Sequence, residues 1–308
     1  MIKYILIYYE TNFKANLTSI CGSDIHAANG SSGRHYAPVA VGHEIVGKVV
    51  KVGCKASSKL KLGDRVGVGA RYFYCKNCDA CKRGLKNNCL KCIGTIFDVD
   101  KGSGVSTQGG DAFHNRNDGD LAFQIPKSLE TNEAAPLLCG GITGFAPLLD
   151  NNVTKVTKIG IVGVGGIGHM AIQFAKALGA EVTTISRTRS KEEDAKKLGA
   201  TRFVASGDPE SMKEHKGTLD NILNTSSSLS QSAIEPLVVL LRPSGTIVVI
   251  STPFKLNFAA EHNIKPWVAT FDINEKDLCE ARVHVESSKV RYRAVMTAFD
   301  KFFAGSRQ

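Results

Sequence analysis

The sequence predicts an α/β protein of two domains, in which a β-rich domain is followed by a doubly wound parallel sheet. Its 308 residues exceed what one hydrophobic core usually serves. Up to about residue 140, short apolar stretches are broken by Gly and Pro, which is typical of short strands. From Lys158 onward, apolar runs of strand length alternate with segments of helical period, which indicates βαβ units.

The elements follow from these patterns in chain order. In the first domain we expect strands at 46–52, 65–68 and 123–125. In the second we expect five strands, at 159–163, 182–186, 202–205, 219–223 and 246–250, and helices at 166–178, 191–198 and 229–241. After Pro266, the segments 267–271 and 290–295 return the chain to the first domain. The predicted boundaries are therefore 1–140, 141–263 and 264–308.

Composition limits the class of protein. No apolar run approaches the roughly 20 residues that span a bilayer. The start, Met1 to Tyr9, is apolar but short and lacks a cleavage pattern, so a strand or an unstructured start is favoured over a signal peptide. The formal charge of +10 is spread along the chain, which favours a solvated basic surface over a nucleic-acid or membrane site. Nine cysteines, four of them crowded together, indicate metal ligation in the reducing cytoplasm.

The crowded cysteines are Cys75, Cys78, Cys81 and Cys89. Four thiolates on short spacers can close around one Zn²⁺ and leave no open position, which predicts a structural zinc. Cys92 follows three residues later and is either a substitute ligand or, as we favour, a bystander.

A glycine-rich turn predicts a dinucleotide site. Gly163, Gly165, Gly166, Ile167 and Gly168 follow a predicted strand and open a predicted helix, where backbone N–H groups can approach a pyrophosphate.

The residues about 20 positions further on indicate which dinucleotide binds. An NAD site would place a carboxylate there, whereas this chain offers Ser186 and Arg187, with Arg189 and Lys191 close by. Cations and a hydroxyl suit a 2′-phosphate and favour NADP(H). The alternative is that they are ordinary surface residues at the start of a helix.

Three separated pieces suggest a second metal: Cys21, His43 with Glu44, and Cys139. Two thiolates and an imidazole match a catalytic zinc with an open fourth position. Taken singly, each cysteine is more often a buried thiol and the histidine a satisfied core residue. Spacing alone cannot link pieces so far apart.

The order of the motifs supplies the link. Cys21-Gly-Ser-Asp-Ile-His26, Gly42-His43-Glu44, the four-cysteine loop, Cys139-Gly-Gly and the 163–168 turn resemble the zinc-dependent medium-chain alcohol dehydrogenases. Matches at 135–143, 185–187 and 290–293 are similar to the NADP-dependent cinnamyl alcohol dehydrogenase branch. The resemblance implies a GroES-like catalytic domain and a Rossmann NADP-binding domain, with Thr143 among the cofactor residues.

The resemblance also implies roles for individual residues. Cys21, His43 and Cys139 would hold the catalytic zinc, which polarises the substrate oxygen, and Glu44 would replace water in some states. Ser23 and His26 would pass the proton to solvent. The competing interpretations are a surface histidine at position 26 and a helix-capping serine at position 23.

The chain departs from the family in four places. Only about twenty residues precede the first ligand motif. The last Rossmann strand and its helix are absent between 250 and 256, which would expose the fifth strand and remove the usual homodimer surface. The polar stretch 111–120 replaces an apolar strand, so we expect weak pairing and local disorder. Asn29 to Gly33 stands where relatives often have a tryptophan, which leaves aromatic substrate preference open.

The expected function is that of an NADP(H)-dependent zinc oxidoreductase that interconverts primary alcohols and aldehydes. The alternative is a catalytically impaired remnant that still binds zinc and NADPH. A nucleic-acid-binding zinc module is disfavoured, because the cysteine loop lacks an adjacent basic helix or aromatic strands. The expected partner is a small alcohol or aldehyde, with no nucleic acid and no membrane.

Overall fold

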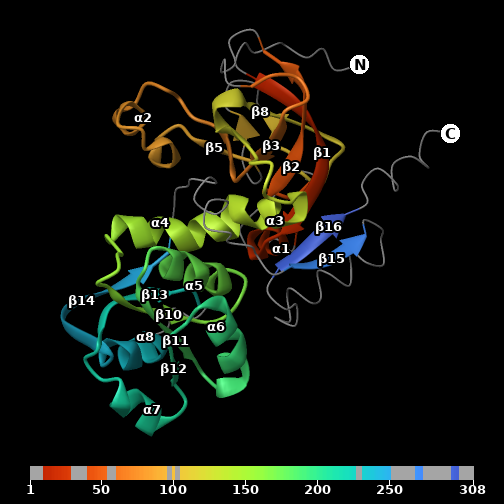
Figure 1. The fold of residues 1–308 in the computed structure, drawn as a ribbon. Coiled ribbons are helices and arrows are strands. Elements are labelled where there is room, and N and C mark those ends of the chain that lie inside the picture. Colours follow the sequence, from red (N-terminus) through yellow and green to blue (C-terminus); the bar gives the residue numbers. More distant parts are fainter. Residues whose placement is uncertain are drawn as a thin grey trace. The chain divides into compact units, whose positions relative to one another are not determined.

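The computed structural model describes residues 10–28, 40–53, 60–95, 99–100, 105–226, 231–250, 268–272 and 293–297. The chain divides into two compact units, one made of 1–139 with 268–308 and the other of 140–267 (Figure 1). The first unit is mainly β and the second is α/β, so the predicted fold class is confirmed. The start of the chain and the segment 251–267 lie outside the described residues.

The first unit is built on a seven-stranded sheet in the order β15-β16-β1-β2-β3-β9, with β8 also paired to β1. Its strands are β1 (Glu10–Ile20), β2 (Ile45–Val52), β3 (Arg65–Val68), β8 (His114–Asp118), β9 (Ala122–Gln124), β15 (Val268–Asp272) and β16 (Arg293–Thr297). Strand β16 pairs antiparallel with the end of β1, so these late residues belong to the first unit. Side chains such as Ile45, Val66 and Val68 form the core.

Strand β8 contradicts the expectation of weak pairing in the polar stretch 111–120. It pairs antiparallel with β1, from Lys14 opposite His114 to Glu10 opposite Asp118. The buried asparagines find backbone partners: Asn115 donates to the carbonyl of Gln108 at 3.2 Å, and Asn117 donates to the carbonyl of Arg71 at 3.3 Å. The expectation of weak pairing was wrong because the strand pairs through its backbone with β1, and the side-chain amide N–H groups of Asn115 and Asn117 find carbonyl partners.

The cysteine loop projects from this sheet as a series of very short elements: β4 (Arg71–Phe73), α2 (Asp79–Lys82), η1 (Lys86–Asn88) and β5 (Ile93–Gly94). Strands β4 and β5 pair antiparallel and close the base of the loop. A second small ribbon joins β6 (Val99–Asp100) to β7 (Val105–Ser106), and η2 (Gly119–Leu121) precedes β9. Such short elements provide little core of their own, so this loop needs another source of stability.

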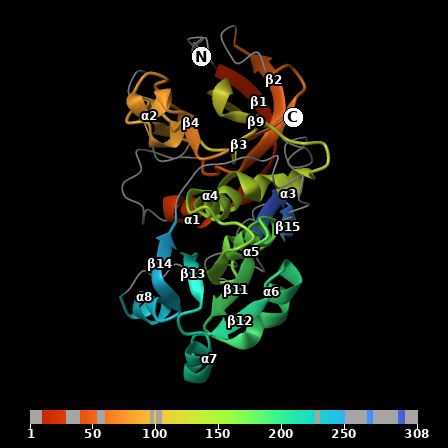
Figure 2. The ribbon, with the colours of Figure 1, turned by 60° about the vertical axis from the view of Figure 1, so that its left-hand side comes forward.

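The second unit holds five parallel strands in the order β12-β11-β10-β13-β14 (Figure 2). They are β10 (Lys158–Val162), β11 (Glu181–Ser186), β12 (Arg202–Ala205), β13 (Leu219–Asn224) and β14 (Leu241–Val249). The connecting helices are α5 (Gly168–Ala177), η4 (Arg189–Lys191) with α6 (Glu192–Leu198), α7 (Pro209–Glu214) and α8 (Gln231–Val238). The order reverses between β10 and β13, which is the doubly wound pattern.

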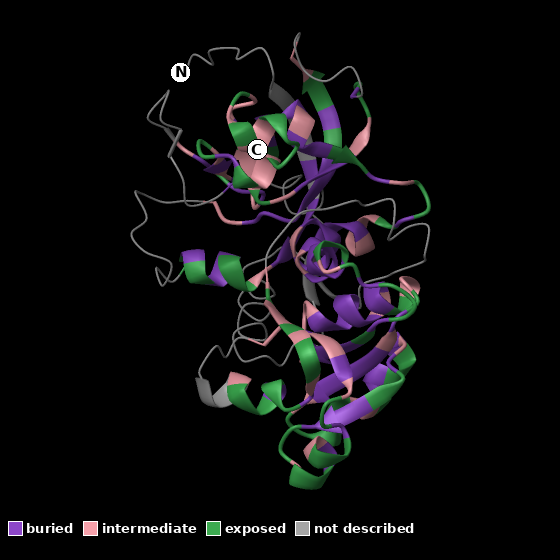
Figure 3. Ribbon diagram, turned by 90° about the vertical axis from the view of Figure 1, so that its left-hand side faces the viewer, coloured by how far each residue is buried: buried purple, intermediate pink, exposed green. Residues whose placement is uncertain are grey.

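Burial follows the pattern of a parallel sheet covered on both faces. Figure 3 shows buried residues along the strands and exposed residues on the outer sides of the helices. Strand β14 is the exception, because each of its residues is exposed or half-buried. The sequence patterns predict all five strands but miss α7, a short helix capped by the carboxylate of Asp208.

A helical run joins the two units in sequence. It consists of α3 (Thr131–Pro136), a π-helical turn η3 (Leu137–Gly141) and α4 (Ile142–Asp150). A capping box between Glu130 and Glu133 starts α3. Pro136 lies inside α3, and the turn that follows it is wider than an α-turn. Wide turns of this kind are frequently found at functional sites.

None of the helices in the described part of the chain is long and apolar enough to cross a membrane.

Candidate active site

Three residues from distant parts of the first unit converge on one point. The ligand atoms of Cys21, His43 and Cys139 all lie within 4.8 Å of one another. Strand β1 ends at Ile20 and β2 begins at Ile45, and because the two strands are antiparallel, the residues just outside them lie at the same edge of the sheet. Cys139 joins them from the π-helical turn.

Asp24 ties the first two ligand segments together. One oxygen of its carboxylate accepts the N–H of Cys21 at 2.8 Å, and this bond caps helix α1 (Gly22–Ala28). The other oxygen accepts the N–H of Gly42 at 2.9 Å and contacts Nδ1 of His43 at 2.7 Å. Asp24 is buried, and the sequence reasoning did not include it among the site residues. The signal was its place three residues after Cys21.

The Asp24 contact orients the histidine. A carboxylate only accepts hydrogen bonds, so Nδ1 of His43 carries a proton, and Nε2 is the nitrogen that a metal would bind in place of a second proton. Burial lowers the pKa of His43, but hydrogen bonds and charges from Asp24 and Cys21 outweigh it and raise the pKa well above its usual value. The imidazole therefore lies in a site that favours a positive charge. Two thiols and an oriented imidazole are the donor set of an open zinc site.

A second carboxyl, that of the half-buried Asp111, lies near this site. The Oδ1 atom of Asp111 is inaccessible and has no hydrogen-bond partner among the described residues. Burial and the nearby charge of Asp24 raise the pKa of Asp111 to about 8, against a smaller opposing effect of His43. Asp111 lies so close to Gly42 that a side chain there would collide with it. Burial thus favours the protonated form of the Asp111 carboxyl.

The other predicted catalytic residues surround the convergent group without entering it. Glu44 is fully buried and accepts a hydrogen bond from the hydroxyl of Ser19. Ser23 and His26 lie on exposed faces of α1, and the hydroxyl of Ser23 is 3.8 Å from the sulfur of Cys21. Both are therefore accessible to solvent, as a proton path requires.

The four-cysteine loop forms a second group. The sulfur atoms of Cys75, Cys78, Cys81 and Cys89 lie within 4.8 Å of one another. The Cys75–Cys81 sulfurs are 3.8 Å apart and the Cys78–Cys81 sulfurs 3.5 Å apart. Zn–S bonds of about 2.3 Å arranged tetrahedrally would separate the sulfurs by about 3.8 Å. Among the described residues, Cys92 packs against this group but does not belong to it.

The shifted pKa values of the thiols in the cysteine loop favour the binding of a cation. Backbone N–H groups of Cys81 and Leu90 lower the pKa of Cys78 to about 6, and those of Asn77 and Cys78 lower the pKa of Cys75. Burial and the neighbouring sulfurs raise the pKa of Cys81 to about 12. The backbone thus stabilises the first thiolates, while their mutual repulsion opposes ionisation of the last. A divalent metal removes that conflict.

A charged network anchors the cysteine loop to the rest of the unit. Nζ of Lys76 lies 2.7 Å from the Asp120 carboxylate and 3.1 Å from that of Asp118, which is buried. The hydroxyl of Tyr74 donates to Asp120 at 3.1 Å. The ammonium groups of Lys76 and Lys86 lie 5.2 and 5.1 Å from the centre of the Tyr74 ring. These contacts hold the loop in one orientation on its own unit.

In the second unit, the glycine turn has the geometry expected of a phosphate loop. Gly163 directly follows β10 and has φ of +90°, which favours glycine. A side chain at Gly168 would lie 1.9 Å from the carbonyl oxygen of Gly163, so the helix start and the strand end can only meet through glycine. Space around Gly165 is open, with nothing within 4 Å of a would-be side chain. Gly166 and Ile167 complete the turn before α5.

The predicted 2′-phosphate residues lie at the end of β11. Ser186 is the last residue of β11, and Arg187 and Lys191 are exposed. The ammonium of Lys191 donates to the carbonyl of Val164 in the glycine turn at 2.9 Å, so the lysine reaches across to the phosphate loop. Arg189 is paired with Glu192, whereas Arg187 forms no ion pair within the described part of the chain. Thr143 lies on α4 and is half-buried.

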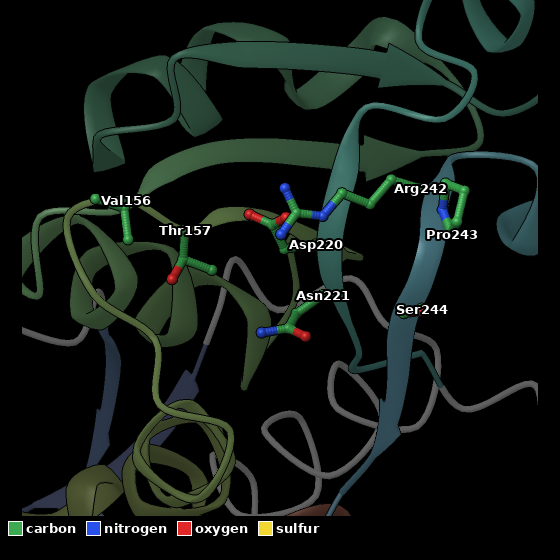
Figure 4. A pocket seen from close by; sticks show the side chains of 7 residues that line it. All are labelled: Val156, Thr157, Asp220, Asn221, Arg242, Pro243 and Ser244. Carbon is green, nitrogen blue, oxygen red and sulfur yellow. The ribbon is translucent and has the colours of Figure 1, made fainter.

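A polar hollow of about 280 Å³ lies at the other end of this sheet (Figure 4). Thr157, Asp220 and Arg242 line it, and the guanidinium of Arg242 points at the carboxylate of Asp220. The hollow is at the amino ends of β10 and β13, while the glycine turn follows the carboxyl end of β10. Dinucleotides bind at carboxyl ends, so the hollow is not the cofactor site.

Comparison with known proteins agrees with this arrangement. Residues 10–124 match the model of the alcohol dehydrogenase GroES-like domain, and residues 166–297 match that of the zinc-binding dehydrogenases. The chain is 37% identical to NADP-dependent alcohol dehydrogenase 6 of Saccharomyces cerevisiae, over 96% of this chain and 91% of that protein.

Solved structures give the same result. A cinnamyl alcohol dehydrogenase from Sorghum bicolor matches with a TM-score of 0.87 and 33% identity, over 96% of this chain and 92% of the other. The CAD of Helicobacter pylori, solved in complex with NADP(H), matches with a TM-score of 0.84 and 27% identity, with the same coverage of both chains. The chain therefore belongs to the zinc-dependent medium-chain alcohol dehydrogenases, in the cinnamyl alcohol dehydrogenase-like branch.

Proposed function

We propose that this chain is an NADP(H)-dependent zinc oxidoreductase that interconverts primary alcohols and aldehydes at the Cys21–His43–Cys139 group. As a member of its family it is an alcohol dehydrogenase, and the relatives named above are NADP-dependent or cinnamyl alcohol dehydrogenases. The observation that supports the site most directly is the convergence of two sulfurs and an oriented imidazole within 4.8 Å. None of these relatives supports the catalytically impaired alternative.

The residues of the site would each contribute a separate function. A zinc held by Cys21, His43 and Cys139 would supply a Lewis acid for the substrate oxygen. Asp24 fixes the histidine tautomer and ring orientation. Ser23 and His26 lie exposed on α1, where a proton can pass to solvent. Glu44 is held by Ser19, next in sequence to the histidine ligand.

The cofactor residues fit NADP(H) better than NAD(H). The glycine turn at 163–168 can approach a pyrophosphate, and α5 starts at its end, where an anion is favoured. The turn lies before β11, whose last residue is Ser186, and Arg187 follows directly. We assign the 2′-phosphate to Ser186, Arg187 and Lys191. NADP(H), once bound, would accept or deliver the hydride.

We propose that the four-cysteine group binds a second zinc with a structural role. We also propose that the protein is cytoplasmic. The four sulfurs of the group leave no open coordination position. Free thiols, none of them paired in a disulfide among the described residues, are typical of reducing compartments.

One experiment tests the proposed function. Metal per chain and NADPH oxidation by a panel of aliphatic and aromatic aldehydes are measured on the same sample, with Cys139→Ser as the matched control. Two zincs and turnover in the wild type, with one zinc and no turnover in the variant, would support the proposal. One zinc and no turnover in the wild type, despite NADPH binding, would support the impaired alternative.

The cofactor assignment has its own test. Arg187→Asp should weaken NADPH binding by a few kcal/mol, roughly the loss of one charge-assisted contact plus a new repulsion. Arg189→Asp is the matched control, because Arg189 is already paired with Glu192. Unchanged NADPH affinity in Arg187→Asp would place the phosphate elsewhere.

A further inference from the structure

The end of strand β3 lies directly against the peptide bond that leads into Cys139. A side-chain carbon on Gly69 would be 2.8 Å from the carbonyl oxygen of Leu138 and 3.8 Å from its carbonyl carbon. Real side-chain carbons essentially never approach an oxygen so closely, so only glycine fits here. The oxygen belongs to the peptide group that joins Leu138 to Cys139, so it cannot move without moving the ligand residue.

Hydrogen bonds from Thr95 also hold the chain at Gly69. The hydroxyl of Thr95 donates to the carbonyl of Gly69 at 2.7 Å, and the N–H of Thr95 donates to the carbonyl of Ala70 at 3.0 Å. Thr95 is only 1% exposed, so this anchor is buried. A shift of the chain at Gly69 would therefore strain these hydrogen bonds, each of which contributes about 1 kcal/mol.

The segment that carries Cys139 is fixed to the same strand at its beginning. The guanidinium of Arg65, at the start of β3, donates to the carbonyls of Pro126 and Leu129 at 2.8 and 2.7 Å. It also donates to the hydroxyl of Thr131, the first residue of α3, at 3.1 Å. Strand β3 thus holds the start of α3 through Arg65 and lies against its π-helical end through Gly69. The side chain of Leu138 is buried as well.

We propose that Gly69 is a positioning residue for the catalytic metal site, because its missing side chain sets how closely Cys139 approaches Cys21 and His43. The inference rests on the proposed function, since it takes these three residues as the zinc ligands. Gly69 contacts neither metal nor substrate. A methyl group at Gly69 has to displace the Leu138 carbonyl by a few tenths of an ångström. Metal–ligand distances tolerate only about 0.2 Å.

The test measures metal affinity as well as turnover in the full chain. Metal-free protein is reconstituted with cobalt(II), and affinity is measured by competition with a chelator, while thiolate-to-cobalt absorption reports the ligand geometry. Gly69→Ala should weaken cobalt binding at the three-ligand site about 10- to 100-fold, as is typical of changes just outside the ligand shell. Binding at the four-cysteine loop should stay unchanged.

The matched control is Gly67→Ala, two residues earlier and within β3. A methyl group there meets the ends of the Leu138 and Ile125 side chains at 2.7 to 2.9 Å, not the Leu138 backbone. It should lower thermal stability but leave cobalt affinity as in the wild type. Equal losses of cobalt affinity in both variants would mean that general packing, and not the position of Cys139, is responsible.

Further variants cover the remaining outcomes. Thr95→Val removes the hydroxyl that pins Gly69, so adding it to Gly69→Ala should recover part of the cobalt affinity although stability falls further. If Gly69→Ala does not fold, the double variant is compared with Thr95→Val alone, and equal affinities would overturn the proposal. If Gly69→Ala binds cobalt with wild-type affinity while Cys139→Ser loses one metal, the inference about Gly69 is overturned and the proposed function is not. Retention of both metals in Cys139→Ser overturns the proposed function.

Discussion

The two cysteine groups of the first unit are built in opposite ways. One lies within fifteen consecutive residues, from Cys75 to Cys89, in a loop whose helices and strands are two to four residues long. The other brings together positions 21, 43 and 139, and depends on the pairing of β1 with β2 and on the π-helical turn. The four-cysteine group needs only its own loop to fold, whereas the three-ligand group forms only when the strands of the sheet pair in register.

The largest expected effect is on stability, and it distinguishes the local four-cysteine site from the three-ligand site that depends on the sheet. Cys78→Ser removes one ligand of the local site, and we expect a loss of several kcal/mol of stability, since structural zinc contributes about 10–16 kcal/mol in small domains. The measurement is thermal unfolding together with metal content. Cys139→Ser is the comparison, with loss of turnover but a nearly wild-type melting temperature. Comparable melting temperatures for the two variants would contradict the division into a structural and a catalytic site.

A smaller effect is expected from the residue that links the remote pieces. Asp24→Asn removes the carboxylate that caps α1 and orients His43. Metal affinity at the three-ligand site should fall by about 10- to 100-fold, while the four-cysteine loop keeps its metal. Competition with a chelator measures both sites. Loss of metal from the loop instead would show that the two sites are not independent.

The anchor of the local site should have a still smaller effect. Lys76→Met leaves the buried carboxylate of Asp118 without its ion pair, at a cost of about 1–2 kcal/mol because the lysine is partly exposed to solvent. Chemical denaturation measures the loss. Arg83→Met is the control, since its ion pair with Asp79 is exposed and should contribute almost nothing. Equal effects in the two variants would remove the special role of the Lys76 network.

The smallest effect concerns the protonation of Asp111. Its pKa is raised to about 8 in the folded state, whereas an unfolded Asp loses its proton above about pH 4. Between these two values, the folded state therefore holds a proton that the unfolded state has released. Stability therefore falls as pH rises from about 4 to 8. Asp111→Asn should remove this dependence, a difference of about 1 kcal/mol between pH 5 and pH 8, because partial solvent exposure and a bound metal both reduce the shift. Denaturation midpoints across that range measure it. Parallel pH profiles would contradict it.

The sequence predicts best what is local. The cysteine spacing, the glycine turn and the five parallel strands each depend on a short window, and each lies where its pattern places it. The convergence of Cys21, His43 and Cys139 needed the resemblance, because no window contains it. Strand β8 was missed because its polarity is compensated by partners outside it, such as the carbonyl of Arg71. Asp24 and Gly69 were missed because their roles depend on contacts that only tertiary structure creates.

The bond between Lys191 and the carbonyl of Val164 limits how the cofactor preference can be redesigned. A lysine that only attracted the 2′-phosphate could be exchanged for an acidic residue to favour NADH. Here the ammonium that we propose for the 2′-phosphate also donates to the glycine turn, so that exchange would place a carboxylate beside a carbonyl and loosen the turn that either dinucleotide needs. A redesign toward NADH would therefore begin at Arg187, keep Lys191, and preserve the loop while changing the specificity.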